Sequence, residues 1–214
     1  MILEGIVKRF QRVGTGGATA LRLTELGNQA VDKVLPDYAQ LAKARRIFCA
    51  STGAGTAIAP VTAMPTTAAT WALFNGEEPG GKSYSVILAG CYSVSGTLGL
   101  GLALLGTVAL SATTGTKPTA YASSVTTNLT GSKVGSQGFL AQGVTMVGTP
   151  AWAVLASRDQ VSAVSVGSGL VAEVKGILSV PPQFVGAFTV LAPVGTTALF
   201  GVSVVFAEVE LDLE

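Results

Sequence analysis

Four long stretches of this chain contain no charged residue, and they limit its possible folds more than any other feature. Each is longer than the roughly 20 residues that a helix needs to cross a bilayer. Prolines and glycines run through them, and these residues interrupt regular helices. The stretches are 47–76, 83–116, 134–157 and 176–207. We therefore expect the sheets of a soluble protein and no membrane segment.

The most apolar part of these stretches, residues 98–105 (LGLGLALL), alternates between leucine and a small residue. A period of two residues is typical of a β-strand, whereas a helix repeats every 3.6 residues. One face of this strand is then expected to carry Leu98, Leu100, Leu102 and Leu104. The other face is expected to carry Gly99, Gly101 and Ala103, which another sheet can approach closely.

The same kind of pattern continues along most of the chain after residue 46. Only 12% of all residues are charged and 27 are glycine, a composition that favours strands and turns over helices. Strands separated by turns, with no helices between them, indicate an antiparallel β-sandwich. We predict a mainly β fold of jelly-roll type, because that architecture has about eight strands. The predicted strands are 56–64, 69–75, 83–95, 97–111, 138–147, 151–156, 170–180, 184–192 and 197–213.

The first 46 residues have a different pattern. Residues 2–13 place six apolar side chains at helical spacing and end at the flexible sequence GTGG. A second helical region is predicted from 24 to 46, interrupted near Pro36. A helix as short as 2–13 is not stable alone and needs a surface to lie on. The expected organisation is an N-terminal helical arm and linker, residues 1–46, followed by a jelly-roll-like sandwich, residues 47–214.

Charge is concentrated at the two ends of the chain. Residues 1–46 hold eight basic and four acidic residues, and the last seven residues hold four acids and no base. Three interpretations stay open: the two ends meet within one chain, they meet between neighbouring subunits, or each end is solvated. The basic arm also leaves open a contact with nucleic acid, although its four acids offset half of its bases.

The closing segment, 206–214, alternates acidic and aliphatic residues. It is predicted to be a strand with one buried and one acidic face, or an edge strand protected by charge. Together with the basic arm it supplies the candidate residues of a subunit interface. These are Ile6, Val7, Lys8, Arg9, Phe10, Arg12, Glu208, Glu210 and Asp212.

Residues 76–83 (GEEPGGKS) match the phosphate-binding pattern G-x-x-x-x-G-K-[ST]. In a nucleotide hydrolase Lys82 would reach the phosphates, and a helix would follow whose N-terminus binds the anion. Here β-branched and aromatic residues follow, and Glu77 and Glu78 would repel phosphate. We therefore interpret the segment as a turn in a β-hairpin.

Other signs of catalysis or of a bound cofactor are missing from the sequence. The chain has no histidine, the commonest general base and metal ligand at neutral pH. Cys49 and Cys91 are too few for a zinc site, and they are interpreted as small buried residues, although a single disulfide stays open. Trp71 and Trp152 are expected to pack in the core. The sequence thus predicts no enzyme, no cofactor and no metal.

Three segments resemble a group of bacteriophage and virus-like structural proteins. They are 38–48 (YAQLAKARRIF), 72–76 with 81–88 (ALFNG and GKSYSVIL), and 180–184 with 202–210 (VPPQF and VSVVFAEVE). The resemblance covers about residues 38–210. It implies a β-sandwich component of a virion, such as a coat, cement or tail-associated protein.

The expected function is therefore structural. The chain is expected to assemble with itself, and with other virion proteins, into a shell or tube, with the N-terminal arm docking on neighbouring subunits. The interfaces of such permanent assemblies are large and apolar, which would explain the low charge. The expected location is a virion or another extracellular assembly. A carbohydrate-binding or adhesive sandwich is the alternative.

Overall fold

The structure is a computed structural model, and it describes residues 38–52, 57–111, 125–131, 135–159 and 169–210. The predicted arm, residues 2–13, lies outside the described residues. The chain divides into two compact units, Met1–Gln40 and Leu41–Glu214, and all described strands belong to the second. The described helix, α1 (Ala39–Lys43), is short. The boundary expected between residues 46 and 47 stays a prediction.

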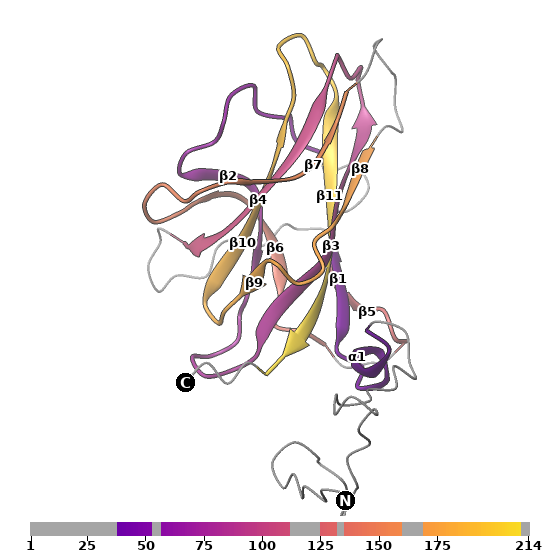
Figure 1. Ribbon diagram of the computed structural model, residues 1–214, viewed down its shortest axis with the longest axis vertical. Coiled ribbons are helices and arrows are strands. Elements are labelled where there is room, and N and C mark those ends of the chain that lie inside the picture. The colour runs from indigo at the N-terminus through magenta and orange to yellow at the C-terminus, as the bar shows by residue number, and fades with distance from the viewer. Residues whose placement is uncertain (1–37, 53–56, 112–124, 132–134, 160–168, 211–214) are drawn as a thin grey trace, which may run out of the picture. The chain divides into compact units, whose positions relative to one another are not determined.

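The strands of the second unit form two antiparallel sheets (Figure 1). Sheet 1 has the order β5 (Val125–Asn128), β1 (Ile47–Ser51), β11 (Leu199–Val209), β3 (Ser83–Ser95) and β8 (Gly169–Glu173), and β9 (Ser179–Val180) also pairs with β3. Sheet 2 has the order β6 (Phe139–Thr145), β2 (Ala68–Phe74), β10 (Phe184–Leu191), β4 (Leu102–Leu110) and β7 (Ala153–Arg158). The predicted mainly β, antiparallel, sandwich-like fold is confirmed.

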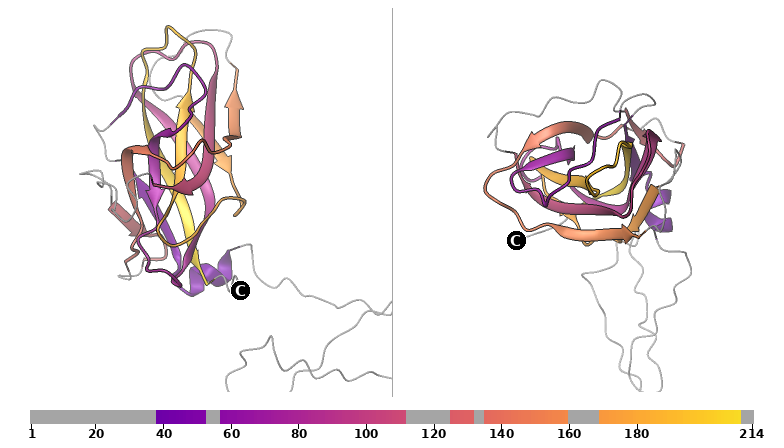
Figure 2. Two further views of the ribbon diagram at one scale, coloured as in Figure 1. Left: turned by 90° about the vertical axis from the view of Figure 1, so that its left-hand side faces the viewer. Right: turned by 90° about the horizontal axis from the view of Figure 1, so that it is seen from above.

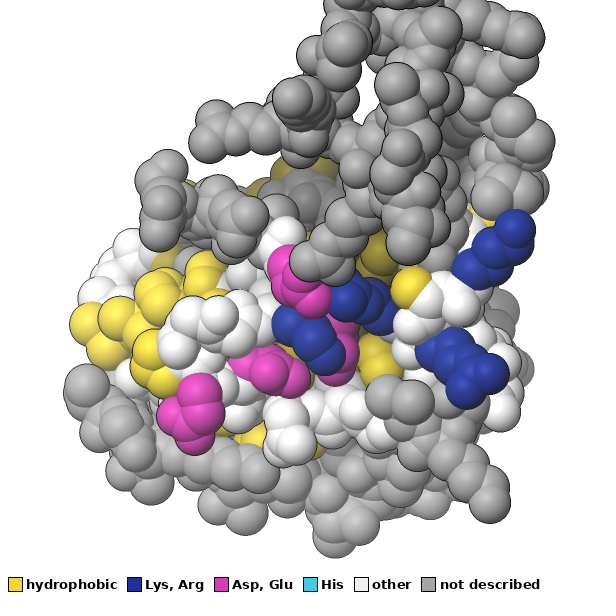
Figure 3. All heavy atoms as spheres, turned by 90° about the horizontal axis from the view of Figure 1, so that it is seen from below, with side chains coloured by type: hydrophobic (Ala, Val, Ile, Leu, Met, Phe, Trp, Pro, Cys, Tyr) yellow, Lys and Arg dark blue, Asp and Glu magenta, His cyan; other side chains and the backbone are white. Residues whose placement is uncertain are grey.

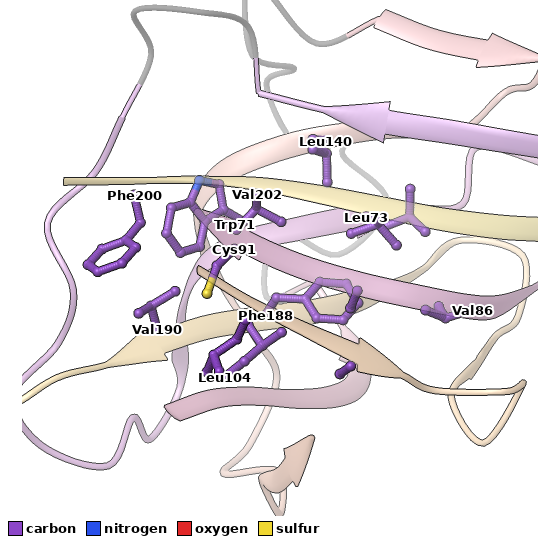
Figure 4. Close-up of a cluster of buried hydrophobic side chains, with 14 of the residues drawn as sticks. Trp71, Leu73, Val86, Cys91, Leu104, Leu140, Phe188, Val190, Phe200 and Val202 are labelled. Atoms are coloured by element: carbon purple, nitrogen blue, oxygen red, sulfur yellow. The ribbon is translucent and has the colours of Figure 1, made fainter. Parts of the chain in front are cut away.

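The core lies between the two sheets, which enclose it when viewed from above (Figure 2). Trp71 of β2 and Phe188 of β10 extend from sheet 2, and they meet Phe200 and Val202 of β11 from sheet 1 (Figure 4). All four side chains have no exposed surface. Alternate residues of each strand therefore supply the core, as a period of two requires.

Strands far apart in the sequence lie side by side. β1 pairs with β11 and β2 pairs with β10, so the first strands pair with the last. β3 pairs with β8 and β4 pairs with β7 further inward along the chain. β11 lies between β1 and β3 inside sheet 1. The interpretation of the closing segment, 206–214, as an edge strand is therefore wrong for residues 206–209, which belong to β11.

Several predicted strands differ from the observed ones. The predicted strand 56–64 makes only the isolated bridges of Ile58 and Val61, in a segment where Pro60 has no amide to donate. The alternating segment 98–105 enters β4 only at Leu102, because Gly101 takes a φ of 92°. Leu100 consequently leaves the buried face and is 59% exposed. Within the described residues, no helix is long and apolar enough to span a membrane.

Candidate functional site

Charged side chains gather at one end of the sandwich, where β1 and β3 begin and β11 ends (Figure 3). We call this group the charged end. It contains four bases and four acids, so its net charge is zero. Its members are Lys43, Arg45, Arg46, Glu77, Glu78, Lys82, Glu208 and Glu210. The described residues carry only four further charges, those of Arg158, Asp159, Glu173 and Lys175.

Two ion pairs hold the charged end together. Lys82 Nζ lies 2.9 Å from Glu208 Oε2, and the Glu208 side chain is only 3% exposed. Arg46 Nη2 lies 2.8 Å from Glu210 Oε1, in a pair that is more exposed. The Arg46–Glu210 pair joins the basic beginning of the chain to its acidic end within one chain. For Arg46 and Glu210, the interpretation that the two charged ends meet within one chain therefore holds.

Glu208 is not on an exposed acidic face, contrary to expectation. It lies two residues after Phe206, which faces the core, and a period of two places both on the same face. Ala207 and Val209 alternate with them and lie on the opposite face of the sheet. Glu208 thus lies on the core side of β11, near the end of the strand.

Tyr84 is packed beside this buried carboxylate. Its ring centroid lies 4.7 Å from that of Phe206, and its hydroxyl accepts a 3.3 Å hydrogen bond from Ser136 Oγ. Burial raises the pKa of Tyr84 above its ordinary value; the hydrogen bond from Ser136 opposes this shift, and the negative charges of Glu208 and Glu77 add to it. Folding therefore favours the neutral, protonated form of the Tyr84 phenol.

This shift predicts a loss of stability in alkaline solution. An unfolded tyrosine has a pKa of about 10. Because the folded pKa is higher, the stabilisation is complete below about pH 10 and decreases as the pH rises above it. Urea unfolding at pH 8 and pH 11 should show a smaller pH-dependent loss for Tyr84→Phe than for wild type. Tyr92→Phe, which also loses one hydroxyl hydrogen bond, is the control at pH 8 for the stability cost of removing a tyrosine hydroxyl. The same loss of unfolding free energy between pH 8 and pH 11 in Tyr84→Phe and in wild type would contradict the prediction.

The segment 76–83 connects the two sheets. It joins β2 of sheet 2 to β3 of sheet 1, so the interpretation as a hairpin is wrong, although a strand does follow it. The Asn75 side chain donates to Lys82 O and Val180 O and accepts from the Glu77 amide. The Gly81 amide donates to Glu78 O. Two loop amides and the lysine are therefore engaged within the protein, unlike those of a phosphate-binding loop.

The outer face of sheet 1 is open and nearly uncharged. Residues directly opposite one another in paired strands share a face, so the pairing defines three rows across it. The rows are Cys49–Val205–Leu88–Glu173, Ser51–Ser203–Gly90–Val171 and Gly201–Tyr92–Gly169. We call these residues the open face. Val171 is 72% exposed and Tyr92 is 39% exposed, and Glu173 supplies the one charge in these rows.

The outer face of sheet 2 is covered, in contrast. On this face, β2, β10, β4 and β6 carry mostly alanine and phenylalanine side chains, and each of those given below is at most 9% exposed. Trp152 packs against this cluster, and its indole nitrogen donates to Thr66 O. The buried residues are Ala72, Phe74, Ala109, Phe139, Ala141, Val185 and Ala187. Among the described residues, the outer face of sheet 1 is thus less covered than that of sheet 2 over β2, β10, β4 and β6.

Both cysteines are free. Cys91 faces the core, where burial raises its pKa to about 11. Cys49 belongs to the open face and is partly exposed, and burial raises its pKa as well. The expectation of two buried residues therefore holds for Cys91 and only in part for Cys49. Trp71 is fully buried as predicted, and Trp152 is half-buried.

The predicted interface residues are thus only partly placed. Ile6, Val7, Lys8, Arg9, Phe10, Arg12 and Asp212 lie outside the described residues. Glu208 is buried beneath Lys82, and Glu210 is exposed beside Arg46. The role of Glu210 in a subunit interface stays a prediction. Sequence reasoning missed the open face, although residues 201–204 alternate small and β-branched side chains, a pattern in which one face of the strand carries little bulk.

A cavity of about 310 Å³ lies beside the start of β4 and the end of β7. Thr62, Ser157 and Asp159 supply its polar groups, and its described lining includes no aromatic side chain. It therefore does not favour the carbohydrate-binding alternative. Among the described residues, no cluster of three Cys, Asp or Glu side chains is placed to hold a metal ion. Comparison of the chain with protein-family models, with curated proteins and with solved structures found no match.

Proposed function

We propose that this chain is a non-enzymatic structural subunit that assembles with itself into a virion or a virus-like shell or tube. Other virion proteins are its further partners, and the N-terminal arm docks on neighbouring subunits. The observation that carries the proposal is the open face of sheet 1, a partly exposed surface that is drawn from four strands and carries one charge, that of Glu173. Exposed apolar surface that is contiguous marks an interaction site in a soluble protein.

We further propose that the sandwich is a jelly roll, an eight-stranded double sheet that recurs in viral capsid and lectin domains. The order of pairing supports this. Eight of the strands pair from the outside inward, as β1 with β11, β2 with β10, β3 with β8 and β4 with β7. β5, β6 and β9 are then additions to this frame, at the margins of the two sheets.

The distribution of charge also supports assembly. The charged end holds eight of the twelve described charged residues, and the two ion pairs within it are made inside one chain. Charged residues are depleted from the centres of protein interfaces, because their desolvation is costly. A subunit with most of its described charges at one end has faces with little charge to bury against its neighbours.

Imaging of the purified chain tests the proposal directly. Negative-stain electron microscopy at increasing protein concentration should show closed particles or tubes of uniform diameter. Light scattering after size-exclusion chromatography should show a mass many times the 21.5 kDa of the chain. A monodisperse monomer at high concentration, under several salt conditions, would overturn it.

A variant of the arm tests its part in assembly. Deleting residues 1–13 should leave the thermal unfolding of the sandwich unchanged, because its core is built from residues after 46. The same deletion should abolish or strongly reduce particle formation. Ile6→Ser with Phe10→Ser should reproduce the deletion, whereas Gln11→Ser, in the same segment, should assemble like wild type. Unchanged assembly of the deletion variant would exclude the arm.

A further inference from the structure

We infer that the apolar side of residues 2–13 of one copy docks on the open face of sheet 1 of a neighbouring copy. The inference rests on the proposed self-assembly and identifies the surface that receives the arm. It differs from the sequence-based expectation, which placed the arm beside the acids of the closing strand. The two described acids of that strand are already paired with Arg46 and Lys82.

The receiving surface has the composition that an apolar segment requires. Its central row joins Cys49, Val205 and Leu88 on three adjacent strands. Gly90 carries no side chain, and a glycine in a strand lets a second segment approach closely. The space above Gly201 is already filled by the ring of Tyr92. The charge at its margin belongs to Glu173, which is paired with Lys175 at 2.9 Å. No desolvation of a central charge opposes docking.

The segment 2–13 complements this surface. Its sequence has helical spacing, so that in a helix the apolar residues would share one side and the four charged residues would lie away from it. Such a short helix needs an apolar surface to be stable. The outer face of sheet 2 is largely buried over β2, β10, β4 and β6, whereas the open face is partly exposed across its strands. The apolar residues are Ile2, Leu3, Ile6, Val7, Phe10 and Val13.

The length of the connecting chain allows the segment to reach another copy. Residues 14–40 separate it from the second unit, and 27 residues span up to on the order of 90 Å when extended. β11 lies beside β1 in the open face; it has 11 residues and is about 37 Å long. The arm can therefore pass beyond its own sheet and cover that of a neighbour.

A single partly exposed thiol, that of Cys49, makes the docking testable. Cys49 lies in the central row of the open face, whereas Cys91 is 2% exposed in the core. A second cysteine in the arm, Ile6→Cys, would lie against Cys49 of the receiving copy. A short bis-maleimide reagent applied to assembled material should then join two chains into a dimer on a denaturing gel. We expect at least fivefold more dimer than from Gln11→Cys, which places the thiol on the polar side.

The controls separate this inference from the proposed function. Adding Cys49→Ser to Ile6→Cys should abolish the dimer, and electron microscopy of the same samples records whether particles form. Particles without the dimer, equal dimer from both arm variants, or a cross-link within one chain overturn the inference and leave the assembly proposal standing. An absence of particles overturns the proposed function, and the inference falls with it.

Discussion

Replacing Trp71 by alanine is expected to lower the free energy of unfolding by about 3–5 kcal/mol, the usual cost of truncating a large buried aromatic side chain. The indole is fully buried on β2, directly opposite Phe188 of β10. It extends from sheet 2 toward Phe200 and Val202 of sheet 1, so its loss opens a cavity between the two sheets (Figure 4). Urea unfolding followed by circular dichroism measures the change.

Trp71→Phe provides the matched control. The indole nitrogen of Trp71 is buried and has no hydrogen-bond partner within the described structure. The phenyl ring fills part of the space and removes this unsatisfied donor, so its cost should be about half that of alanine. An alanine variant that loses less than about 1 kcal/mol would mean that Trp71 does not anchor the core.

Replacing Lys82 by methionine is expected to cost about 2–3 kcal/mol. Removing one partner of a fully buried ion pair costs about 3–5 kcal/mol, because the other charge stays buried without compensation. The Glu208 side chain is 3% exposed, but that of Lys82 is 36% exposed, and solvent screening lowers the expected value. Chemical denaturation at neutral pH and low salt checks it.

Two further variants isolate the effect of burial. Lys175→Met removes a pair of the same 2.9 Å length, with Glu173, whose side chains are 68% and 66% exposed. Its cost should stay below about 0.5 kcal/mol. The double variant Lys82→Met with Glu208→Met should recover most of the stability lost in Lys82→Met, because it leaves no buried charge. Additive losses in the double variant would show that the two side chains are not coupled.

The strands with strong periodic patterns were predictable from the sequence. Segment 83–95 was predicted as a strand and is β3, because β-branched and aromatic residues fill it between clear turns. β1 and β5 were not predicted, since they are short and rich in small residues and become strands by pairing with each other and with β11. That pairing is long-range and leaves no local signal. The expectation that Leu100 shares a strand face with Leu102 and Leu104 was wrong for a different reason, because Gly101 takes a positive φ.

The candidate site was predictable only as separate pieces. The sequence showed a basic beginning, an acidic end and a lysine in segment 76–83, but not that Lys82 and Glu208 meet across 126 residues. That meeting depends on β11 lying beside β3, which a local pattern does not reveal. The open face was hidden for the same reason, because its rows are drawn from four strands. The period of two along β11 did contain the information that Glu208 shares the face of Phe206.

The central position of β11 has a consequence for how the subunit is made. β11 is the last described strand to leave the ribosome, yet it lies between β1 and β3 in sheet 1. Until it arrives, those two strands have unpaired edges, which are templates for pairing with other chains. The sheet can close only when synthesis of this strand is complete, and such long-range pairing makes folding slow. The open face, to which β11 contributes its central strand, therefore forms only after β11 has been translated.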